Sequence, residues 1–323
     1  ARVARIVRIA RGRGEPRVDG RDRRRVEDRR RKQESAGERA PLEIMRPIEQ
    51  RVVKIDGAAA TVMTRLGESP AQHTYLDWEL TALVHALRPN GAAAVIGVGG
   101  GRDVLAAVRA GHAPVLGLEL NALIVELLRA EMADFAGLSQ LPAVKLVHEE
   151  ARSFLARDTG QYSVITMSLI DTWAATGAGA YSLSENGLYT VEAFSTLLQR
   201  LAPDGVLAVS RWYFASNPGE VTRLLALAMD ALWANGAVAP RAHMALLRSG
   251  NVATLLLCRA AYGPDALQHL QRVAAGRGFE ILLDPHTTPA SLPLREVASQ
   301  PSRAALQRWA AAQALDVSPP TDD

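Results

Sequence analysis

The stretch Val95-Ile96-Gly97-Val98-Gly99-Gly100-Gly101-Arg102-Asp103, followed by Leu116-Gly117-Leu118-Glu119, decides the fold of this chain. It is typical of an apolar strand, a glycine-rich turn that begins a helix, and a second strand that ends in a carboxylate. Glycine lets the backbone approach a ligand closely, and an acidic side chain at the second strand's tip can accept hydrogen bonds from ribose hydroxyls. The pattern therefore predicts a site for a nucleoside-containing cofactor, and a tight turn without a ligand is the alternative. The binding residues of such a site would be Gly97, Gly99, Gly101 and Glu119.

From residue 92 onward, strand-like and helix-like patterns alternate along the chain. The predicted strands span residues 92–97, 114–119, 143–147, 162–168, 205–210, 252–258 and 279–283. The predicted helices span residues 102–110, 121–133, 150–157, 190–201, 218–235 and 264–276. Strands separated by helices of about 10–15 residues predict an α/β fold with a doubly wound, mainly parallel sheet. That sheet would have seven strands, of which the last two would form an antiparallel edge.

Composition divides the chain into regions. The predicted regions are a basic disordered arm (1–40), a small N-terminal region (41–90), a Rossmann-like cofactor and catalytic domain (91–284) and a proline-rich tail (285–323). Within the small region, the patterns predict a β-hairpin over residues 48–66 and a helix over residues 75–87. The tail is expected to wrap the surface.

Charge is segregated along the chain. Residues 1–32 hold 14 Arg and Lys against 5 Asp and Glu, whereas the whole chain carries only +3, so the remainder is mildly acidic. The basic arm lacks the interleaved aromatic residues and the motifs of nucleic-acid-binding modules. A solvated arm is favoured, attraction to an anionic membrane surface is the second interpretation, and specific nucleic-acid binding is not expected.

Composition also disfavours several classes of site. The single cysteine, Cys258, allows neither an internal disulfide nor a multi-cysteine metal site. The seven histidines include no pair at helical ligand spacing, so no metal is expected. No run approaches the ~18 apolar residues of a membrane span. The chain is therefore expected in the cytoplasm or at the cytoplasmic face of a membrane.

Polar residues follow two further predicted strands. Glu150 can cap the next helix or accept the amino group of an adenine, with the Ala151 N–H meeting a ring nitrogen. The fourth strand ends in Ser168-Leu169-Ile170-Asp171, where Asp171 is a candidate to hold a cationic amine or accept a proton. Because the carboxyl ends of parallel strands share one edge of a sheet, these residues and the glycine turn are expected to converge.

A loop rich in small residues spans residues 174–180 and leads into residues 181–190. Its length and composition are typical of a lid over an active site, and a surface loop packed by Trp173 and Tyr181 is the alternative. Glu185 in this segment could help Asp171 to hold an amine.

These residues resemble the spermidine/spermine synthase family of aminopropyltransferases. The similarity covers about residues 48–323 and rests on the triple glycine, Glu119, residues 150–155 and residues 188–194. The strings over residues 97–105 and 171–176 are most similar to the family's bacterial membrane-fused branch. The resemblance implies a methyltransferase-type Rossmann fold and decarboxylated S-adenosylmethionine as co-substrate. It also implies that the chain is a soluble domain of a longer membrane protein.

Several of the family's functional residues carry over to this sequence. Glu119 matches the ribose-binding acid and Glu150 the acid on the adenine side. Tyr75 matches a tyrosine on the substrate side, and Asp171 matches the second aspartate of the family's string after the fourth strand.

Two other positions depart from the family. Ser168 stands where the family has the aspartate that is assigned as the base, and a serine hydroxyl cannot take up that proton at neutral pH. The aspartate that follows the family's triple glycine and holds the aminopropyl ammonium has no direct match. Gly101 or Arg102 occupies its place, with Asp103 nearby.

Three functions follow from these observations. The first is transfer of an aminopropyl group from decarboxylated S-adenosylmethionine to a polyamine-type amine, with Asp171 and Ser168 as catalytic residues. Tyr75, Asp171, Tyr181 and Glu185 would then contact the substrate. The second is methyl transfer from S-adenosylmethionine, because Arg102 suits a carboxylate better than an ammonium. The third is an adenosyl-binding module of a membrane protein that has no catalytic activity.

The expected partner is a small-molecule amine. A homodimer, and membrane association through the basic arm or through flanking segments, are further alternatives.

Overall fold

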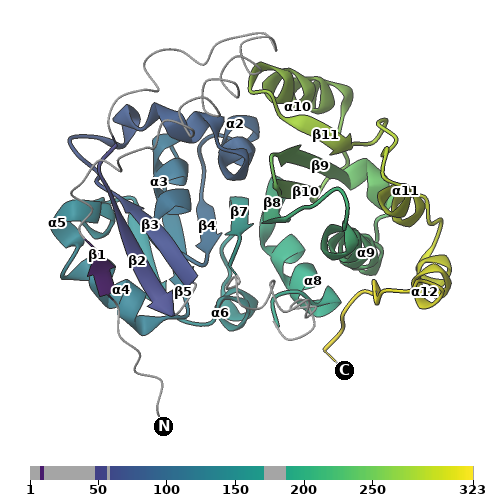
Figure 1. The fold of residues 1–323 in the computed structure, drawn as a ribbon, viewed down its shortest axis with the longest axis horizontal. Helices are drawn as coiled ribbons and strands as arrows, with labels where there is room; N and C mark the ends of the chain where they lie inside the picture. Colours follow the sequence, from purple (N-terminus) through teal and green to yellow (C-terminus); the bar gives the residue numbers. More distant parts are fainter. Residues whose placement is uncertain (1–7, 11–47, 57–58, 171–186, 323) are drawn as a thin grey trace, which may run out of the picture.

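The computed structural model describes residues 8–10, 48–56, 59–170 and 187–322 (Figure 1). Its strands are β1 (Arg8–Ala10), β2 (Gln50–Asp56), β3 (Ala59–Thr64), β4 (Ala93–Ile96), β5 (Val115–Glu119), β6 (Val144–His148), β7 (Tyr162–Ser168), β8 (Leu201–Trp212), β9 (Met244–Ser249), β10 (Val252–Cys258) and β11 (Glu280–Leu283). Its α-helices are α2 (Leu83–Leu87), α3 (Arg102–Arg109), α4 (Ala122–Arg129), α5 (Ala133–Ala136), α6 (Ala151–Arg157), α8 (Val191–Arg200), α9 (Gly219–Ala234), α10 (Pro264–Gly276), α11 (Leu292–Ala298) and α12 (Arg303–Ala311). Short 3-10 helices are η2 (Pro70–Gln72), η3 (Thr74–Trp78), η4 (Leu80–Ala82), η5 (Leu138–Gln140) and η7 (Pro240–His243).

The large sheet has eight strands in the order β11-β9-β10-β8-β7-β4-β5-β6. Strands β6, β5, β4, β7 and β8 pair in parallel, and β10, β9 and β11 extend the sheet with antiparallel pairs. The α/β architecture, the mainly parallel sheet and the antiparallel edge are thereby confirmed.

The predicted number of seven strands is wrong, because β9 was not recognised. This strand lies between β10 and β11, so the last two predicted strands do not pair with each other. Its sequence, Met-Ala-Leu-Leu-Arg-Ser, is a short apolar run without alternation, which periodicity cannot distinguish from a helix segment.

Both faces of the large sheet are covered by helices. In β4, Ala94 and Ile96 belong to one buried cluster with residues of α6, α8 and α9. Ala93 and Val95 belong to a second cluster with residues of α3, α4 and α10. Successive residues of one strand therefore pack into opposite layers, which is why the parallel strands are almost continuously apolar.

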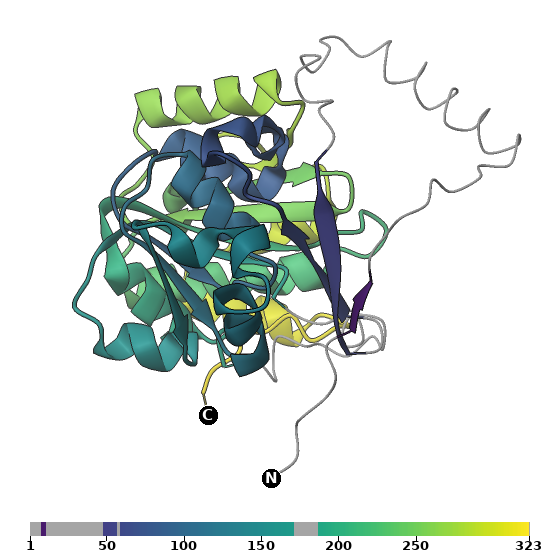
Figure 2. The ribbon, with the colours of Figure 1, turned by 90° about the vertical axis from the view of Figure 1, so that its left-hand side faces the viewer.

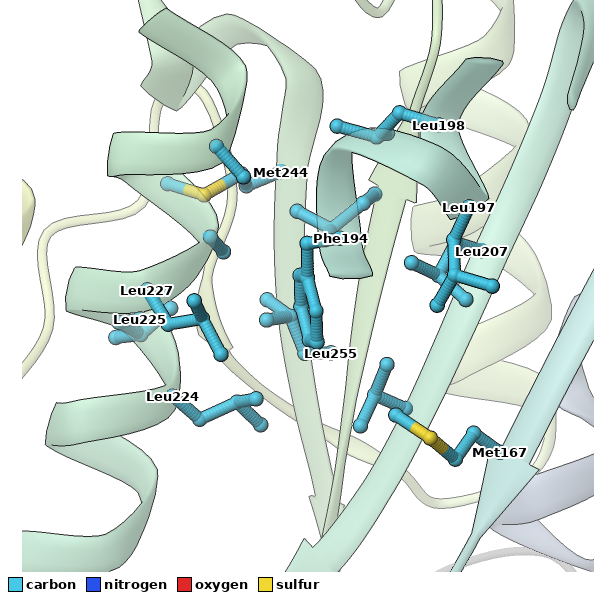
Figure 3. Packing of buried hydrophobic residues seen from close by; sticks show 14 of the residues in the cluster. Met167, Phe194, Leu197, Leu198, Leu207, Leu224, Leu225, Leu227, Met244 and Leu255 are labelled. Atoms are coloured by element: carbon cyan, nitrogen blue, oxygen red, sulfur yellow. The ribbon is translucent and has the colours of Figure 1, made fainter. Parts of the chain in front are cut away.

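The larger cluster fills the space between α8, α9 and the strands beside them. Figure 3 shows Phe194 of α8 with the leucines of α9 on one side and Leu207 of β8 on the other. Phe194 and Leu255 are fully buried. This part of the molecule is a close-packed apolar core.

The N-terminal region forms the predicted hairpin from β2 and β3, which Figure 2 shows at the right-hand side of the molecule. Residues 8–10, predicted to be part of a disordered arm, instead pair with β2 as strand β1. The predicted helix over residues 75–87 is also wrong over most of its length. It is divided into η3, η4 and α2, with Glu79 in extended conformation (φ −87°, ψ 134°) between the first two. Aromatic and β-branched residues lower the helix propensity of this segment.

The C-terminal tail is more regular than predicted. It contains α11 and α12, whose Leu294, Val297 and Leu306 are buried in the cluster beneath α9. A proline at the start of α11 and the Ser302 cap of α12 begin these helices, so prolines here mark helix starts rather than irregular structure. Across the described ranges, no helix has both the length and the apolar character that a membrane crossing requires.

Candidate functional site

The turn between β4 and α3 depends on glycine. Gly97, Gly99 and Gly101 all have positive φ, at 77°, 50° and 87°. At Gly101 a Cβ atom would lie 2.1 Å from Leu138 Cδ1, so a side chain there would have to displace Leu138 and adopt a strained backbone conformation. The predicted glycine-rich turn is therefore present between strand and helix.

The hairpin covers this turn directly. Gly100 donates its N–H to Thr61 Oγ1 over 2.8 Å. A Cβ atom at Gly100 would lie only 2.1 Å from the carbonyl oxygen of Val62 in β3. No residue larger than glycine fits here, so an aspartate cannot occupy this position while the hairpin stays in place.

The amide groups of the turn are used within the protein. Gly97 donates to the carbonyl of Leu118 over 2.9 Å, and Gly101 donates to the carbonyl of Val98 over 2.8 Å. Gly99 donates to Glu119 Oε2 over 2.9 Å. Together with the bond from Gly100 to Thr61, all four glycine N–H groups already have acceptors.

Glu119 lies at the end of β5, as predicted. Its Oε2 accepts the Gly99 N–H, and its Oε1 accepts the Asn121 N–H over 2.9 Å. A carboxylate oxygen has two lone pairs, so each oxygen retains the capacity to accept one ligand hydroxyl. The structure thus fixes the orientation of this carboxylate before any ligand binds.

A cavity of about 330 Å³ lies where these elements meet. The ends of β4, β5, β7 and β8, the start of α3 and strand β3 of the hairpin contribute to its wall. The lining residues are Ala60, Thr61, Val62, Gly97, Val98, Gly99, Gly100, Arg102, Asp103, Glu119, Asn121, Ile124, Ser168, Leu169, Ile170 and Trp212. The strand ends that carry the glycine turn, Glu119 and Ser168 therefore converge as the sequence predicted.

Asp103 is the buried acid of this cavity, with only 8% of its surface exposed. Arg102 Nε lies 3.7 Å from Asp103 Oδ1, and Arg102 Nη1 lies 3.1 Å from Glu79 Oε2. Two carboxylates thus share one guanidinium.

Burial raises the pKa values of both carboxyl groups in this cluster. The pKa of Asp103 is raised by desolvation, and Arg102 and the Ser168 hydroxyl oppose the rise. Burial raises the pKa of Glu79 as well; Arg102 opposes that rise and Asp103 adds to it. Burial thus stabilises the protonated form of each acid, and a bound cation would stabilise the ionised form.

Ser168 ends β7 beside Asp103. Its hydroxyl lies close enough to the Asp103 carboxylate to favour the ionised form. Its Oγ is buried, however, and no atom of the described residues completes a well-formed hydrogen bond with it. Leu169 follows with a φ of +51°, a conformation that is uncommon for a residue with a branched side chain.

Glu150 and Ala151 lie outside the cavity wall. Glu150 caps α6, because its carboxylate accepts the N–H groups of Arg152 (2.8 Å) and Ser153 (2.7 Å). Burial opposes ionisation of Glu150, but these hydrogen bonds outweigh it and lower its pKa. Ala151 is buried in the first turn of the helix. The capping role is what the geometry shows, and an adenine contact by these residues stays a prediction.

Tyr75 is half-buried on η3, and its hydroxyl lies 3.1 Å from Thr64 Oγ1. Burial raises its pKa, and the charge of Glu79 contributes to the rise. Tyr75 therefore lies close to the acidic cluster, although it does not line the cavity. Asp171, Tyr181 and Glu185 lie outside the described residues.

Three residues of the site were missed by sequence reasoning. Thr61 reaches the turn from a hairpin that carries no recognisable motif. Glu79 lies four residues after Tyr75, in a segment predicted to be a helix. Trp212 ends β8, and the rule that ligands bind at strand ends could have indicated it.

Comparison with known proteins supports the fold. No protein-family model and no curated protein matches the sequence. Among solved structures, a probable spermidine synthase from Corynebacterium glutamicum has a TM-score of 0.51 at 18% identity, over 79% of this chain and 88% of that chain. A spermidine synthase from Thermotoga maritima has a TM-score of 0.43 at 13% identity, over 68% and 72% of the two chains. An rRNA methylase from Streptococcus thermophilus has a TM-score of 0.37 at 14% identity, over 58% and 95%.

The similarity to the first of these structures, at a TM-score of 0.51, supports the observed fold. The chain has a methyltransferase-like Rossmann fold, with a small antiparallel hairpin sheet at its N-terminal side. The expected membrane-fused branch of the spermidine synthase family is left untested by these comparisons.

Proposed function

We propose that this chain is a transferase of the spermidine synthase type, which moves an aminopropyl group from decarboxylated S-adenosylmethionine to a polyamine-type amine. The observation that carries the proposal is the charge balance at the start of α3. There, the Arg102 guanidinium pairs with two partly buried carboxylates, Glu79 and Asp103, of which Asp103 lines the cavity.

The adenosyl half of such a co-substrate has a suitable partner. Glu119 is held by two backbone amides and faces the cavity with lone pairs for the ribose hydroxyls. The glycine turn lets the ligand approach the backbone beside it. These features suit any adenosyl sulfonium and do not distinguish one from another.

The two cofactors differ in charge at the amino end of the co-substrate. When Asp103 and Glu79 are ionised, the cluster with Arg102 carries one surplus negative charge. Decarboxylated S-adenosylmethionine ends in an ammonium alone, which balances this charge. The amino-acid end of S-adenosylmethionine carries both an ammonium and a carboxylate, and its carboxylate would leave the surplus in place.

The backbone of the glycine turn favours the same ligand. A carboxylate needs hydrogen-bond donors, and the four glycine N–H groups already donate to protein acceptors. An ammonium needs acceptors instead, and the Asp103 carboxylate lies in the cavity wall.

The proposed reaction is a nucleophilic substitution at the carbon beside the sulfonium. The amine nitrogen forms the new C–N bond while the C–S bond breaks. The electron pair of the C–S bond remains on the sulfur of the departing methylthioadenosine. The attacking amine must be neutral, so its proton has to reach a base. We assign the holding and deprotonation of this amine to Asp171, because Ser168, at the position of the family's base, cannot take up the proton and Asp171 is the carboxylate that follows the same strand.

Methyl transfer from S-adenosylmethionine is the second candidate, and one observation favours it. The Arg102 side chain is 39% exposed and lines the cavity, so its guanidinium could also meet a ligand carboxylate.

The direct test is to incubate the protein with each cofactor and a panel of diamines and polyamines, and to identify products by mass spectrometry. The proposal expects aminopropylated amine and methylthioadenosine. It also expects Asp171→Asn to abolish transfer while the affinity for the cofactor stays within a few-fold. Methylated product would contradict aminopropyl transfer. Full turnover by Asp171→Asn would contradict the role of Asp171.

A further inference from the structure

Glu79 is a charged residue to which neither the fold nor the family resemblance assigns a role. It lies between η3 and η4, and its side chain is 29% exposed. Its Oε2 lies 3.1 Å from Arg102 Nη1, the shorter of the two carboxylate contacts of that arginine. The groups whose charges act on Glu79 are Arg102 and Asp103, and Glu79 in turn acts on Tyr75.

Arg102 is the residue of the cavity best suited to bind a carboxylate. A guanidinium presents five N–H donors in a planar fork that matches two carboxylate oxygens. Arg102 also begins α3, where the helix dipole favours an anion. Left alone, this arginine would favour a cofactor that retains its carboxylate.

We propose that Glu79 is a specificity-determining residue: by pairing with Arg102, it makes the cavity select the decarboxylated cofactor. This inference rests on the proposed function. Glu79 supplies the charge that turns a neutral Arg102–Asp103 pair into a cluster with one surplus negative charge. It also occupies donors of the guanidinium that a ligand carboxylate would otherwise use.

The experiment measures three dissociation constants by calorimetry at pH 8. The ligands are decarboxylated S-adenosylmethionine, S-adenosylmethionine and methylthioadenosine, and the last has no amino end. The proteins are the wild type, Glu79→Gln, Arg102→Gln and the double variant. The result is expressed as the ratio of the two cofactor affinities, because a change in folding affects both cofactors alike.

The wild type is expected to prefer the decarboxylated cofactor. In Glu79→Gln the preference is expected to fall about tenfold, the size of one partly exposed charge interaction. Methylthioadenosine is expected to bind Glu79→Gln as it binds the wild type. In the Arg102→Gln background, removing Glu79 is expected to change the ratio much less, since Glu79 acts through Arg102.

Glu49→Gln serves as a matched control. Glu49 also pairs with an arginine, Arg65, over 2.6 Å, but neither residue lines the cavity. This variant is expected to leave the ratio unchanged.

The outcomes distinguish a failure of the proposed function from a failure of the role of Glu79. A wild type that prefers S-adenosylmethionine, or that forms no aminopropylated product, contradicts the proposed function. A wild type with the expected preference, together with an unchanged ratio in Glu79→Gln, contradicts only the role of Glu79. An equal loss of preference in both backgrounds contradicts the action through Arg102.

Discussion

The edge of the sheet at the cavity and the core beneath α8 and α9 are built by different rules. Around Phe194, apolar side chains fill the space between helices and strands (Figure 3). At the cavity, the backbone of the hairpin lies against the glycine turn, and the Asp103 carboxyl group is buried beside it. The apolar core supplies most of the stability. At the cavity, burial of charge and a constrained backbone are unfavourable for stability but form a binding site.

The comparison predicts that substitutions in the two regions act on different properties. Changes in the core lower the free energy of unfolding and leave the affinity of correctly folded molecules intact. Changes at the cavity alter affinity, discrimination and pH dependence more than stability.

The largest effect is expected from Phe194→Ala in the core. Phe194 is fully buried, so its removal leaves a cavity and lowers the free energy of unfolding by about 3–5 kcal/mol. Denaturant unfolding measures this loss. Calorimetry on the folded fraction is expected to give the wild-type affinity for methylthioadenosine, and a large loss of affinity would show that the two regions are not independent.

Gly100→Ala is expected to affect both properties, because it lies where the two backbones meet. The new Cβ would lie 2.1 Å from the Val62 carbonyl oxygen, so the hairpin must move away. We expect a loss of about 1–3 kcal/mol in the free energy of unfolding and a clear loss of cofactor affinity.

The control for this variant is Gly276→Ala in α10, where a Cβ meets nothing within 4 Å. That change is expected to be neutral or to stabilise by up to about 1 kcal/mol. Equal free energies of unfolding and equal cofactor affinities in the two variants would contradict the close approach of the hairpin to the glycine turn.

Asp103→Asn is expected to separate affinity from stability. It removes the buried charge that would balance the ligand's ammonium, so affinity for decarboxylated S-adenosylmethionine should fall about tenfold or more. The free energy of unfolding should change by less than about 1 kcal/mol, because the charged form is costly to bury. Calorimetry and denaturant unfolding of the same preparation provide both values. A loss of stability without a loss of affinity would show that Asp103 has a structural role and does not bind the ligand.

The smallest effect concerns pH. Burial raises the pKa values of Asp103 and Glu79, and a cationic ligand favours the ionised forms. Affinity should therefore rise with pH as the two groups deprotonate and then level off. The same groups lower the free energy of unfolding as the pH rises, because their carboxyl groups ionise less readily in the folded than in the unfolded chain. Affinity that is constant with pH would contradict the assignment of these acids to the cation.

Local patterns were sufficient for the parts of the site that lie close in sequence. The glycine turn and Glu119 follow from strand ends and glycine spacing, and each was predicted where it occurs. Thr61 reaches Gly100 across 39 residues, and Glu79 meets Arg102 from a separate segment. Such contacts depend on how the hairpin and η3–η4 pack on the sheet, which periodicity does not encode.

The errors in the fold have similar causes. Strand β9 has no alternation that would identify it, and its place between β10 and β11 depends on pairing over a long range. The helices of the tail were missed because prolines suggested irregular structure, whereas a proline lies within the first two residues of α11.

The cavity at the ends of β4, β5 and β7 is proposed to select an adenosyl sulfonium whose side chain ends in an ammonium alone. The most direct measurement is a paired calorimetric titration of the wild-type protein with decarboxylated S-adenosylmethionine and with S-adenosylmethionine. We expect tighter binding of the decarboxylated cofactor, and a loss of that preference in Glu79→Gln. Tighter binding of S-adenosylmethionine, or no binding of either cofactor, would contradict it.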